Sequence, residues 1–452
     1  MSSNIERLSP APTTTVKPAQ HGSAALYQRA LKVMPGGCSR NTILRKPHPI
    51  YVEYGEGCYV TDIEGTRRID FANNMASLIH GHAQPEVVAA VTSQLQKGTA
   101  FMMATEVEVK FAEHMCGRNP GFEKLRFVNS GTEAVMSCLK AARAYTGRSK
   151  IAKVEGAYHG IYDYAEISQT AKPENWGDAA RPSSVAVSRG TPPATLDDVI
   201  VVPYNDTEKA IAILDTHADQ LACVLVDLMA HRVGLIKAKD EYVHALRKWT
   251  EDHGVLLVCD EVITLRATYG GAQTKYPINP DLTAMGKMIG GGFPVGAIAG
   301  RADIMEVMNP LAEQVLFPHS GTFSANPVSM TAGLIAMRLY DQSAVNRLNR
   351  LTKMARHRIA EAIEIAGFPA CVTGGGSMFR LHMKPEPPHD YRSTFATPEQ
   401  ARKLKLLLDY AFDHGVMLIG TGSGALSTAM TETEIDTLAQ VMLEGFRMLK
   451  QA

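Results

Sequence analysis

The sequence predicts an α/β protein with a large, doubly wound, mostly parallel sheet domain and a smaller α+β domain built from both chain ends. Between about residues 83 and 310, short apolar runs alternate with helical periods, as in buried parallel strands joined by crossover helices. On either side, the pattern changes to alternating strands and long helices. A chain of 452 residues also exceeds the size of a single core, which favours two domains.

The expected elements follow in order along the chain. An amphipathic segment around 24–34 ends at the turn signal PGG (35–37), and residues 51–71 alternate about Gly65 as short antiparallel strands do. Five apolar runs predict buried strands: KLRFVNS (124–130), IAKVEGA (151–157), VIVVPYN (199–205), ACVLVDLM (222–229) and VLLVCDEV (255–262). Long helical stretches at 329–366 and 397–415 flank the segment CVTGGGSMFRLHM (371–383).

We expect a loosely ordered arm over residues 1–22, which are polar and rich in Pro and Thr. The small domain would begin over 23–75, the large domain would span 76–318, and residues 319–452 would complete the small domain. Lys plus Arg equals Asp plus Glu at 46 each, so no net field draws the protein to nucleic acid or anionic lipid. The seven cysteines form no CxxC pair and no metal-like cluster, which argues against disulfides and zinc and fits a reduced cytosol.

The first functional motif is NSGTEA (129–134), where an apolar run stops and a helical period begins. A helix starting there would present backbone N–H groups, its positive dipole end and the hydroxyls of Ser130 and Thr132 to an anion. The pattern predicts a phosphate cradle. An ordinary helix cap at Ser130, with Glu133 in the first turn, explains the same residues equally well.

The second motif is Asp260-Glu261-Val262, directly after an apolar run. A carboxylate at the carboxyl end of a parallel strand lies in the crevice where α/β proteins bind ligands. Asp260 could pair with the protonated ring nitrogen of a pyridine cofactor, which lets the ring take up the electrons of a carbanion. A capping aspartate or a metal-binding acid explains this segment equally well in isolation.

The third motif is Lys287, which ends an apolar stretch and precedes the glycine-rich MIGGGFPVGAIAG (288–300). A desolvated lysine loses its proton readily and acts as a Schiff-base nucleophile. A solvated surface lysine is the simpler alternative, but it explains the apolar, glycine-rich surroundings poorly. The glycines are not a nucleotide-binding phosphate loop, because no GK[ST] follows them.

Five motifs occur in the order and spacing of class III, fold type I aminotransferases, which use pyridoxal 5′-phosphate: NSGTEA, GAYHG (156–160), CDEVITLR (259–266), DLTAMGKMIGGGFPVGAIAG (281–300) and HSGTFSANP (319–327). The resemblance extends from about residue 25 to the C-terminus. Within this class, PGG (35–37), GKMIGGGFPVGA (286–297) and GGGSMF (374–379) resemble the branch of glutamate-1-semialdehyde aminomutase and the β-amino-acid (β-phenylalanine type) aminotransferases.

The resemblance implies a role for each matching residue. Lys287 would form the Schiff base with the cofactor and then shuttle a proton between substrate and cofactor, and Asp260 would pair with the ring nitrogen. Tyr158 would stack on one ring face while Val262 supports the other. The phosphate would be held by four residues, the last from a neighbouring subunit: Ser130, Gly131, Thr132 and Thr322. A homodimer with shared active sites is therefore implied.

Two segments separate the members of this branch. The aminomutase typically has an EPVAGNMG-like segment, whereas this chain has DLMAHRVGL (227–235), closer to the DLMPxRxGL of the β-amino-acid aminotransferases. In that group an arginine after the PGG turn binds the substrate carboxylate, and the matching residue is Arg40, for which a surface ion pair is the simpler alternative. The group's second arginine, in a segment like APRGM, has no counterpart in IGTGSGALS (419–427). Without this arginine, pyruvate and alanine become more plausible than 2-oxoglutarate and glutamate as the acceptor and donor pair, as does an amine donor without a carboxylate. Arg266 is a possible substitute cation for a second carboxylate, and a structural role is the alternative for this residue.

We therefore predict a pyridoxal-phosphate-dependent aminotransferase that moves an amino group from an amine or β-amino acid to pyruvate or 2-oxoglutarate in a ping-pong cycle. The alternatives are a glutamate-1-semialdehyde-type 2,1-aminomutase, which needs no separate acceptor, and a catalytically silent cofactor-binding module. We expect a cytoplasmic homodimer without metal, nucleic-acid or membrane partners. Three histidines are interpreted as packing or surface residues, namely His80, His82 and His114. His159 is adjacent to Tyr158, but no cofactor role is assigned to it.

Overall fold

The computed structural model describes residues 22–451, which divide into two compact units. The first unit comprises the chain up to Gly55 together with Val60–Arg68, and the second comprises Glu56–Tyr59 and everything from Ile69 onward. The predicted arm lies outside the described residues except for Gly22. The predicted domain boundaries near residues 75 and 318 stay predictions.

The first unit contains the predicted N-terminal helix, α1 (Ser23–Leu31), followed by a turn at Pro35–Gly37. The strands that the alternating pattern predicts are β1 (Val52–Glu56), β2 (Tyr59–Asp62) and β3 (Arg67–Asp70). Within this unit, the carboxylate of Glu64 accepts hydrogen bonds from the backbone and hydroxyl of Ser23 at 2.7 and 3.0 Å. A side chain that caps the free N–H groups of a first turn stabilises the start of the helix.

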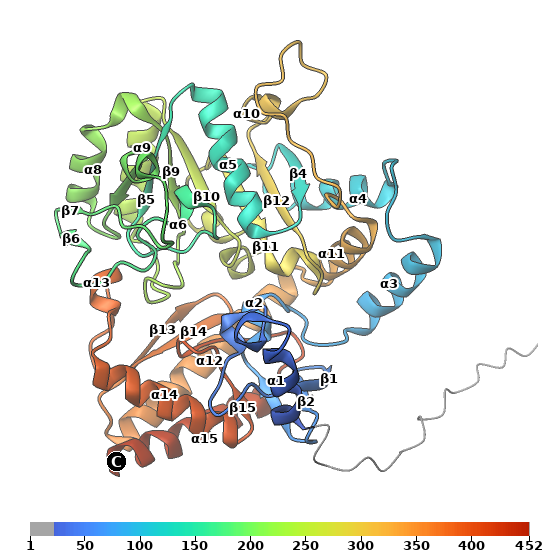
Figure 1. The fold of residues 1–452 in the computed structure, drawn as a ribbon, viewed down its shortest axis with the longest axis vertical. Helices are drawn as coiled ribbons and strands as arrows, with labels where there is room; N and C mark the ends of the chain where they lie inside the picture. The colour runs from blue at the N-terminus through green and yellow to red at the C-terminus, as the bar shows by residue number, and fades with distance from the viewer. Residues whose placement is uncertain (1–21, 452) are drawn as a thin grey trace, which may run out of the picture. The chain divides into compact units, whose positions relative to one another are not determined.

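The centre of the second unit is a seven-stranded sheet in the order β4-β12-β11-β10-β9-β5-β8 (Figure 1). Its strands are β4 (Lys124–Val128), β5 (Lys150–Val154), β8 (Val199–Val202), β9 (Leu221–Val226), β10 (Leu256–Asp260), β11 (Leu282–Gly286) and β12 (Gly296–Gly300). All neighbours run parallel except β12, which is antiparallel to both β11 and β4. The five strands predicted from apolar runs are confirmed, and the mostly parallel sheet agrees with fold type I.

Helices cover both faces of this sheet, which makes it doubly wound. On one face, Val224 and Leu257 pack in a core with α8 (Thr207–Asp215) and α9 (Asp240–Asp252). On the other face, Cys223 and Val258 pack in a core with α5 (Gly131–Thr146). Alternate residues of one strand enter opposite cores because strand side chains alternate between faces. Apolar runs without polar interruption are the sequence signature of such strands.

The C-terminal third is α+β, as predicted, with four helices of 13 to 25 residues and a small antiparallel sheet in the order β13-β14-β16 (Figure 1). Its elements are α11 (Pro327–Leu339), α12 (Gln342–Ala366), β13 (Cys371–Gly375), β14 (Met378–His382), α14 (Pro398–Asp413), β16 (Ser423–Ala425) and α15 (Glu432–Gln451). The predicted helical stretch 329–366 is two helices. The break falls at Asp341, whose side chain accepts a hydrogen bond from the backbone N–H of Ala344 at 2.8 Å and so starts α12.

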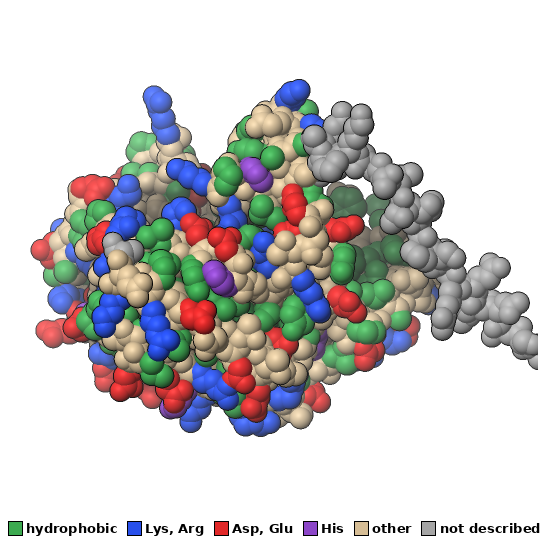
Figure 2. Space-filling model, turned by 90° about the horizontal axis from the view of Figure 1, so that it is seen from below, with side chains coloured by type: hydrophobic (Ala, Val, Ile, Leu, Met, Phe, Trp, Pro, Cys, Tyr) green, Lys and Arg blue, Asp and Glu red, His purple; other side chains and the backbone are tan. Residues whose placement is uncertain are grey.

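Charges of both signs are interspersed over the face shown in Figure 2, in keeping with the equal numbers of basic and acidic residues. Among residues 22–451, the helices are all too short or too polar to cross a membrane. Within the same residues, the His, Cys, Asp and Glu side chains form no group that could hold a metal ion.

Candidate active site

Glycines bring the predicted motifs together at the carboxyl ends of the parallel strands. A Cβ atom on Gly131 would lie 2.8 Å from Val262 Cγ1, and one on Gly286 would lie 3.2 Å from the Cα of Gly131. A Cβ atom on Gly160 would lie 2.5 Å from Thr132 Oγ1. These approaches join segments that follow four different strands, β4, β5, β10 and β11. Ligand sites of open α/β sheets lie at this edge.

The N-terminus of α5 combines a helix cap with a cradle for an anion. Ser130 Oγ accepts a hydrogen bond from the N–H of Glu133 at 3.1 Å, and the Glu133 carboxylate accepts one from the N–H of Asn129 at 2.6 Å. Within residues 22–451, the N–H groups of Gly131 and Thr132 have no acceptor. The helix cap is therefore present, and it uses the N–H groups of Asn129 and Glu133 but not those of Gly131 and Thr132, so the predicted phosphate cradle is compatible with it.

Asp260 lies at the end of β10, 4 % exposed, with a donor on each carboxylate oxygen. Its Oδ1 accepts a hydrogen bond from the N–H of Val262 at 2.9 Å, and its Oδ2 accepts one from Nδ1 of His159 at 2.7 Å. Burial lowers the pKa of His159, which keeps the imidazole neutral with its proton on Nδ1. The two donors fix the orientation of the acid, and His159 acts on the site through Asp260.

Lys287 directly follows β11, in a conformation that few non-glycine residues adopt. Its φ of 50° lies in the left-handed region, and such strained positions occur preferentially at functional sites. Burial lowers the pKa of its amine, while the charges of Asp260 and Asp227 act in the opposite direction. An amine in this environment releases its proton more readily than a solvated lysine and is a better nucleophile.

Tyr158 and Val262 are the residues predicted for the two faces of the cofactor ring, and these roles stay predictions. The ring of Tyr158 is 42 % exposed, and the guanidinium of Arg232 lies 5.0 Å from its centroid. Val262 packs against Gly131 at the start of α5. A partly exposed aromatic ring and a branched apolar side chain are suited to the two faces of a planar cofactor.

Two of the predicted site residues keep the roles that the resemblance implies as predictions only. Thr322 is exposed in the segment before α11, and its contact with the phosphate of a second subunit stays a prediction. Arg40 is exposed in the first unit, and its role with the substrate stays a prediction as well. Arg266 instead has a structural role, because its guanidinium donates to Ser377 Oγ at 2.5 Å and to the carbonyl oxygens of Ala76 and Leu426.

One acid of the site was missed from sequence. Asp227 follows β9, the neighbour of β10, and accepts a hydrogen bond from the N–H of Met229 at 2.9 Å. Burial and the charge of Asp260 raise the pKa of Asp227 well above its ordinary value, which favours the protonated form of this acid. The signal that singled out Asp260, an acid at the end of a buried run, applies equally to the run ACVLVDLM.

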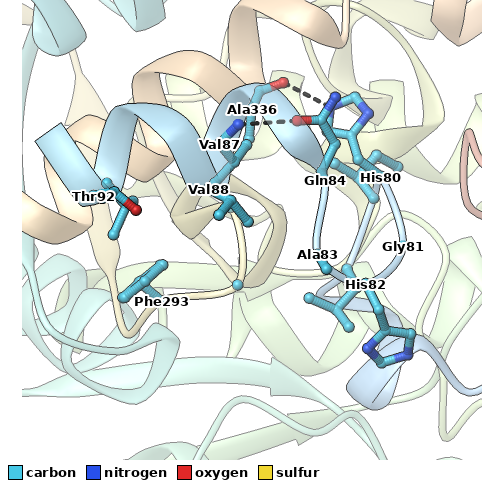
Figure 3. A pocket seen from close by; sticks show the side chains of 15 residues that line it. His80, Gly81, His82, Ala83, Gln84, Val87, Val88, Thr92, Phe293 and Ala336 are labelled. Carbon is cyan, nitrogen blue, oxygen red and sulfur yellow. Dashed lines mark hydrogen bonds between the residues drawn. The ribbon is translucent and has the colours of Figure 1, made fainter. Parts of the chain in front are cut away.

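A cavity of about 250 Å³ borders the glycine loop that follows Lys287 (Figure 3). The loops 78–84 and 291–293, the start of α3 (Pro85–Lys97) and Ala336 of α11 line it. In Figure 3, His80 is bound to the carbonyl oxygen of Ala336, and Gln84 caps the helix by accepting from the N–H of Val87. His80 is therefore a packing residue, as expected, while His82 Nε2 contacts Asp70 at 2.8 Å.

A buried acid, a desolvated lysine and an anion cradle at one edge of the same sheet are suited to an enzyme that uses a phosphorylated pyridine cofactor. The chain belongs to the class III aminotransferases, because the family model described as "Aminotransferase class-III" matches residues 43–448. It is 37 % identical over 396 residues to a glutamate-1-semialdehyde 2,1-aminomutase of Methanothermobacter thermautotrophicus, covering 87 % of this chain and 90 % of that protein.

Two solved structures are similar over nearly the whole chain. The ω-transaminase from Sphaerobacter thermophilus is 41 % identical with a TM-score of 0.93, covering 95 % of this chain and 98 % of that one. The β-phenylalanine aminotransferase from Variovorax paradoxus is 32 % identical with a TM-score of 0.83, covering 93 % of each chain. The predicted class and branch are confirmed.

The cofactor of this family is pyridoxal 5′-phosphate, and the residues of this chain fit it. The acceptor-free N–H groups of Gly131 and Thr132 suit its phosphate, and Asp260 suits its ring nitrogen. The close approach at Gly131 and Gly160 leaves no space for a side chain where the backbone would meet the phosphate. When bound, the cofactor supplies an electron sink for cleavage of a bond at the carbon that bears the amino group.

Proposed function

We propose that the protein moves an amino group from an amine or β-amino acid to an oxo-acid, pyruvate or 2-oxoglutarate, in a ping-pong cycle. The convergence of Lys287, Asp260 and the start of α5 at one sheet edge supports this proposal. Lys287 Nζ would hold the cofactor and then take and return the proton at the substrate carbon, because its lowered pKa favours the neutral amine. Asp260 would keep the ring nitrogen protonated.

Sequence and structural neighbours both bear on the choice of transfer over internal rearrangement. The segment DLMAHRVGL resembles the β-amino-acid aminotransferases, and the transaminase neighbour has the higher identity and coverage. A 2,1-aminomutase is the second candidate, because the curated relative at 37 % identity has that name. We further propose a cytoplasmic homodimer in which Thr322 reaches the phosphate of the neighbouring site.

Dependence on an added oxo-acid separates the two candidates, because only the transferase needs a separate acceptor. The visible absorption of the purified enzyme is recorded with a panel of amines and β-amino acids, first without acceptor and then with pyruvate or 2-oxoglutarate. A transferase loses the band of the lysine-bound cofactor with particular donors and regains it with the oxo-acid. Lys287→Ala is the control that lacks this band.

Conversion of glutamate-1-semialdehyde to its amino isomer without any oxo-acid would favour the aminomutase. A band that no donor bleaches, with no such conversion, would refute both candidates and favour a silent cofactor-binding module. Size-exclusion chromatography with light scattering tests the homodimer separately, with a mass of twice 49.0 kDa as the expected result.

A further inference from the structure

We propose that Arg380, together with His231 and Thr421, forms a subsite for the distal carboxylate of a dicarboxylate amino-group partner, 2-oxoglutarate or glutamate. This inference rests on the proposed transaminase function and names one of its substrates. It also answers the argument against dicarboxylates that the missing arginine of segment 419–427 raises.

Arg380 lies directly opposite that segment. It belongs to β14, where it pairs with Ser423 of the neighbouring strand β16. The sequence lacks an arginine in 419–427, and the antiparallel pairing brings one beside the segment from a different part of the chain. Paired residues on neighbouring strands lie only about 5 Å apart, well within the length of an arginine side chain.

The guanidinium of Arg380 is held in place but is not neutralised. Its Nη1 donates to the carbonyl oxygen of His231 at 2.6 Å, and its buried Nε has no partner among residues 22–451. The nearby Arg232 donates to the carbonyl oxygen of Gln169 at 3.0 Å. Within the described residues, neither arginine pairs with a carboxylate.

Two neighbouring cations without an anion are costly in a partly buried site. Burial and the charge of Arg232 lower the pKa of Arg380 to about 10, so the guanidinium still carries its charge at neutral pH. A buried charge is stable only when it is paired and hydrogen-bonded. A ligand carboxylate would supply the missing acceptor for Nε and for the second terminal nitrogen in the two-point geometry that arginine favours.

His231 is close enough to both Arg380 and Lys287 for the charge of each to act on its imidazole. Burial and the charges of Arg380 and Lys287 lower the pKa of His231 to about 3, so the imidazole is neutral and lies within the field of both cations. Its Nε2 lies 3.3 Å from Thr421 Oγ1. As whole residues, His231, Arg380 and Thr421 are each half-buried, while the Nε atom of Arg380 is itself buried.

Mono- and dicarboxylate acceptors distinguish this subsite from a general effect on catalysis. Pyruvate has no distal carboxylate, so the loss of Arg380 should act on 2-oxoglutarate alone. The holoenzyme is assayed with each acceptor in wild type and in the Arg380→Met and Arg380→Lys variants. Arg356→Met is the matched control, because Arg356 also has a buried, unpartnered Nε and one hydrogen bond to a carbonyl oxygen, that of Gly374 at 2.9 Å.

We expect Arg380→Met to raise KM for 2-oxoglutarate about 10- to 100-fold, as the loss of charged hydrogen bonds would. The KM for pyruvate should change less than about threefold in the same variant, and Arg380→Lys should restore only part of the loss, because an ammonium lacks the planar fork. Equal effects on both acceptors, or an effect of Arg356→Met as large as that of Arg380→Met, would overturn the proposal.

A direct binding measurement tests the carboxylate subsite independently of the proposed transaminase function. Glutarate has two carboxylates and no reactive carbonyl, so its binding to the holoenzyme is measured by calorimetry, with propionate for comparison. The proposal predicts that glutarate binds and that Arg380→Met weakens it about 10-fold or more. If the enzyme transfers amino groups to pyruvate but binds neither glutarate nor 2-oxoglutarate, the subsite is refuted while the transaminase function stands. Glutarate binding through Arg380 without any transamination would refute the function alone.

Discussion

Replacing His159 by leucine tests how the site orients its acid. The imidazole is buried and donates to Asp260 Oδ2 at 2.7 Å, a short hydrogen bond between a neutral donor and a charged acceptor. Such bonds contribute about 1.5–3 kcal/mol. Leucine removes the donor and leaves the second donor, the N–H of Val262, in place. Asp260 would then keep its position but lose the restraint on one oxygen.

If most of the energy of the His159–Asp260 hydrogen bond serves to orient Asp260 towards the ring nitrogen, the dissociation constant of the cofactor should rise about 10- to 150-fold in His159→Leu. The assay titrates apo-protein with pyridoxal 5′-phosphate and follows the visible band of the bound form. We expect kcat to fall together with affinity, while KM for the amino donor changes little, because His159 acts through Asp260.

The matched control is His114→Leu on α4 (Glu106–Cys116), since His114 is also a histidine with an unpartnered Nε2 whose pKa is lowered by burial. Thermal melting of both variants separates loss of stability from loss of cofactor binding. A folded His159→Leu protein that binds the cofactor as tightly as wild type, with unchanged kcat, would refute the idea that this hydrogen bond positions the acid.

Four further substitutions test other parts of the site and its surroundings. Asp227→Asn should retain most activity, because the raised pKa of Asp227 favours the protonated acid, which asparagine resembles. Asp260→Asn should abolish transfer, and steady-state rates compare the two variants. Burial lowers the pKa of Lys153 from 10.5 to about 7. Above pH 7 the unfolded protein therefore binds more protons than the folded protein, and the free energy of unfolding should rise with pH by up to about 1.4 kcal/mol per pH unit. Lys153→Met should lose that slope in melting curves between pH 7 and 9. Gly160→Ala, at a φ of 94° and in contact with Thr132, should weaken pyridoxal phosphate about 10-fold or more but leave unphosphorylated pyridoxal little changed.

The sequence predicts most of the sheet because its strands are buried on both faces. β9 is a continuous apolar run that is followed by an acid, and the apolar run of β10 ends in one. The sequence pattern therefore predicts both the strand and the position of its functional residue. β12 is different, because GAIAG is a short segment of mostly small residues bounded by glycines, and its sequence does not indicate the direction of the strand. The break between α11 and α12 was missed because the apolar helical period continues through the residue before Asp341.

Residues whose role depends on a distant partner were beyond a reading of local motifs. Lys287 and Asp260 lie in motifs that resemble a family, and they were predicted. His159 acts through an acid 101 residues away, and Arg380 is held by the carbonyl oxygen of a residue 149 positions earlier. Periodicity and motif spacing do not predict such contacts, because these contacts form only when the order of the strands brings separate loops to one edge of the sheet.

The order of the strands places two acids, Asp260 and Asp227, close together beside the cofactor site, and their environments favour a charge on only one of them. β11, β10 and β9 are neighbours, and their ends carry Lys287, Asp260 and Asp227. Burial favours the neutral forms of Lys287 and Asp227, whereas Asp260 has two donors on its oxygens. A protonated pyridine nitrogen requires one adjacent anion, and a second ionised acid on the next strand would repel the first and compete for the same proton. Two acids on adjacent strand ends can therefore support this chemistry because their environments differ, with donors concentrated on only one of them.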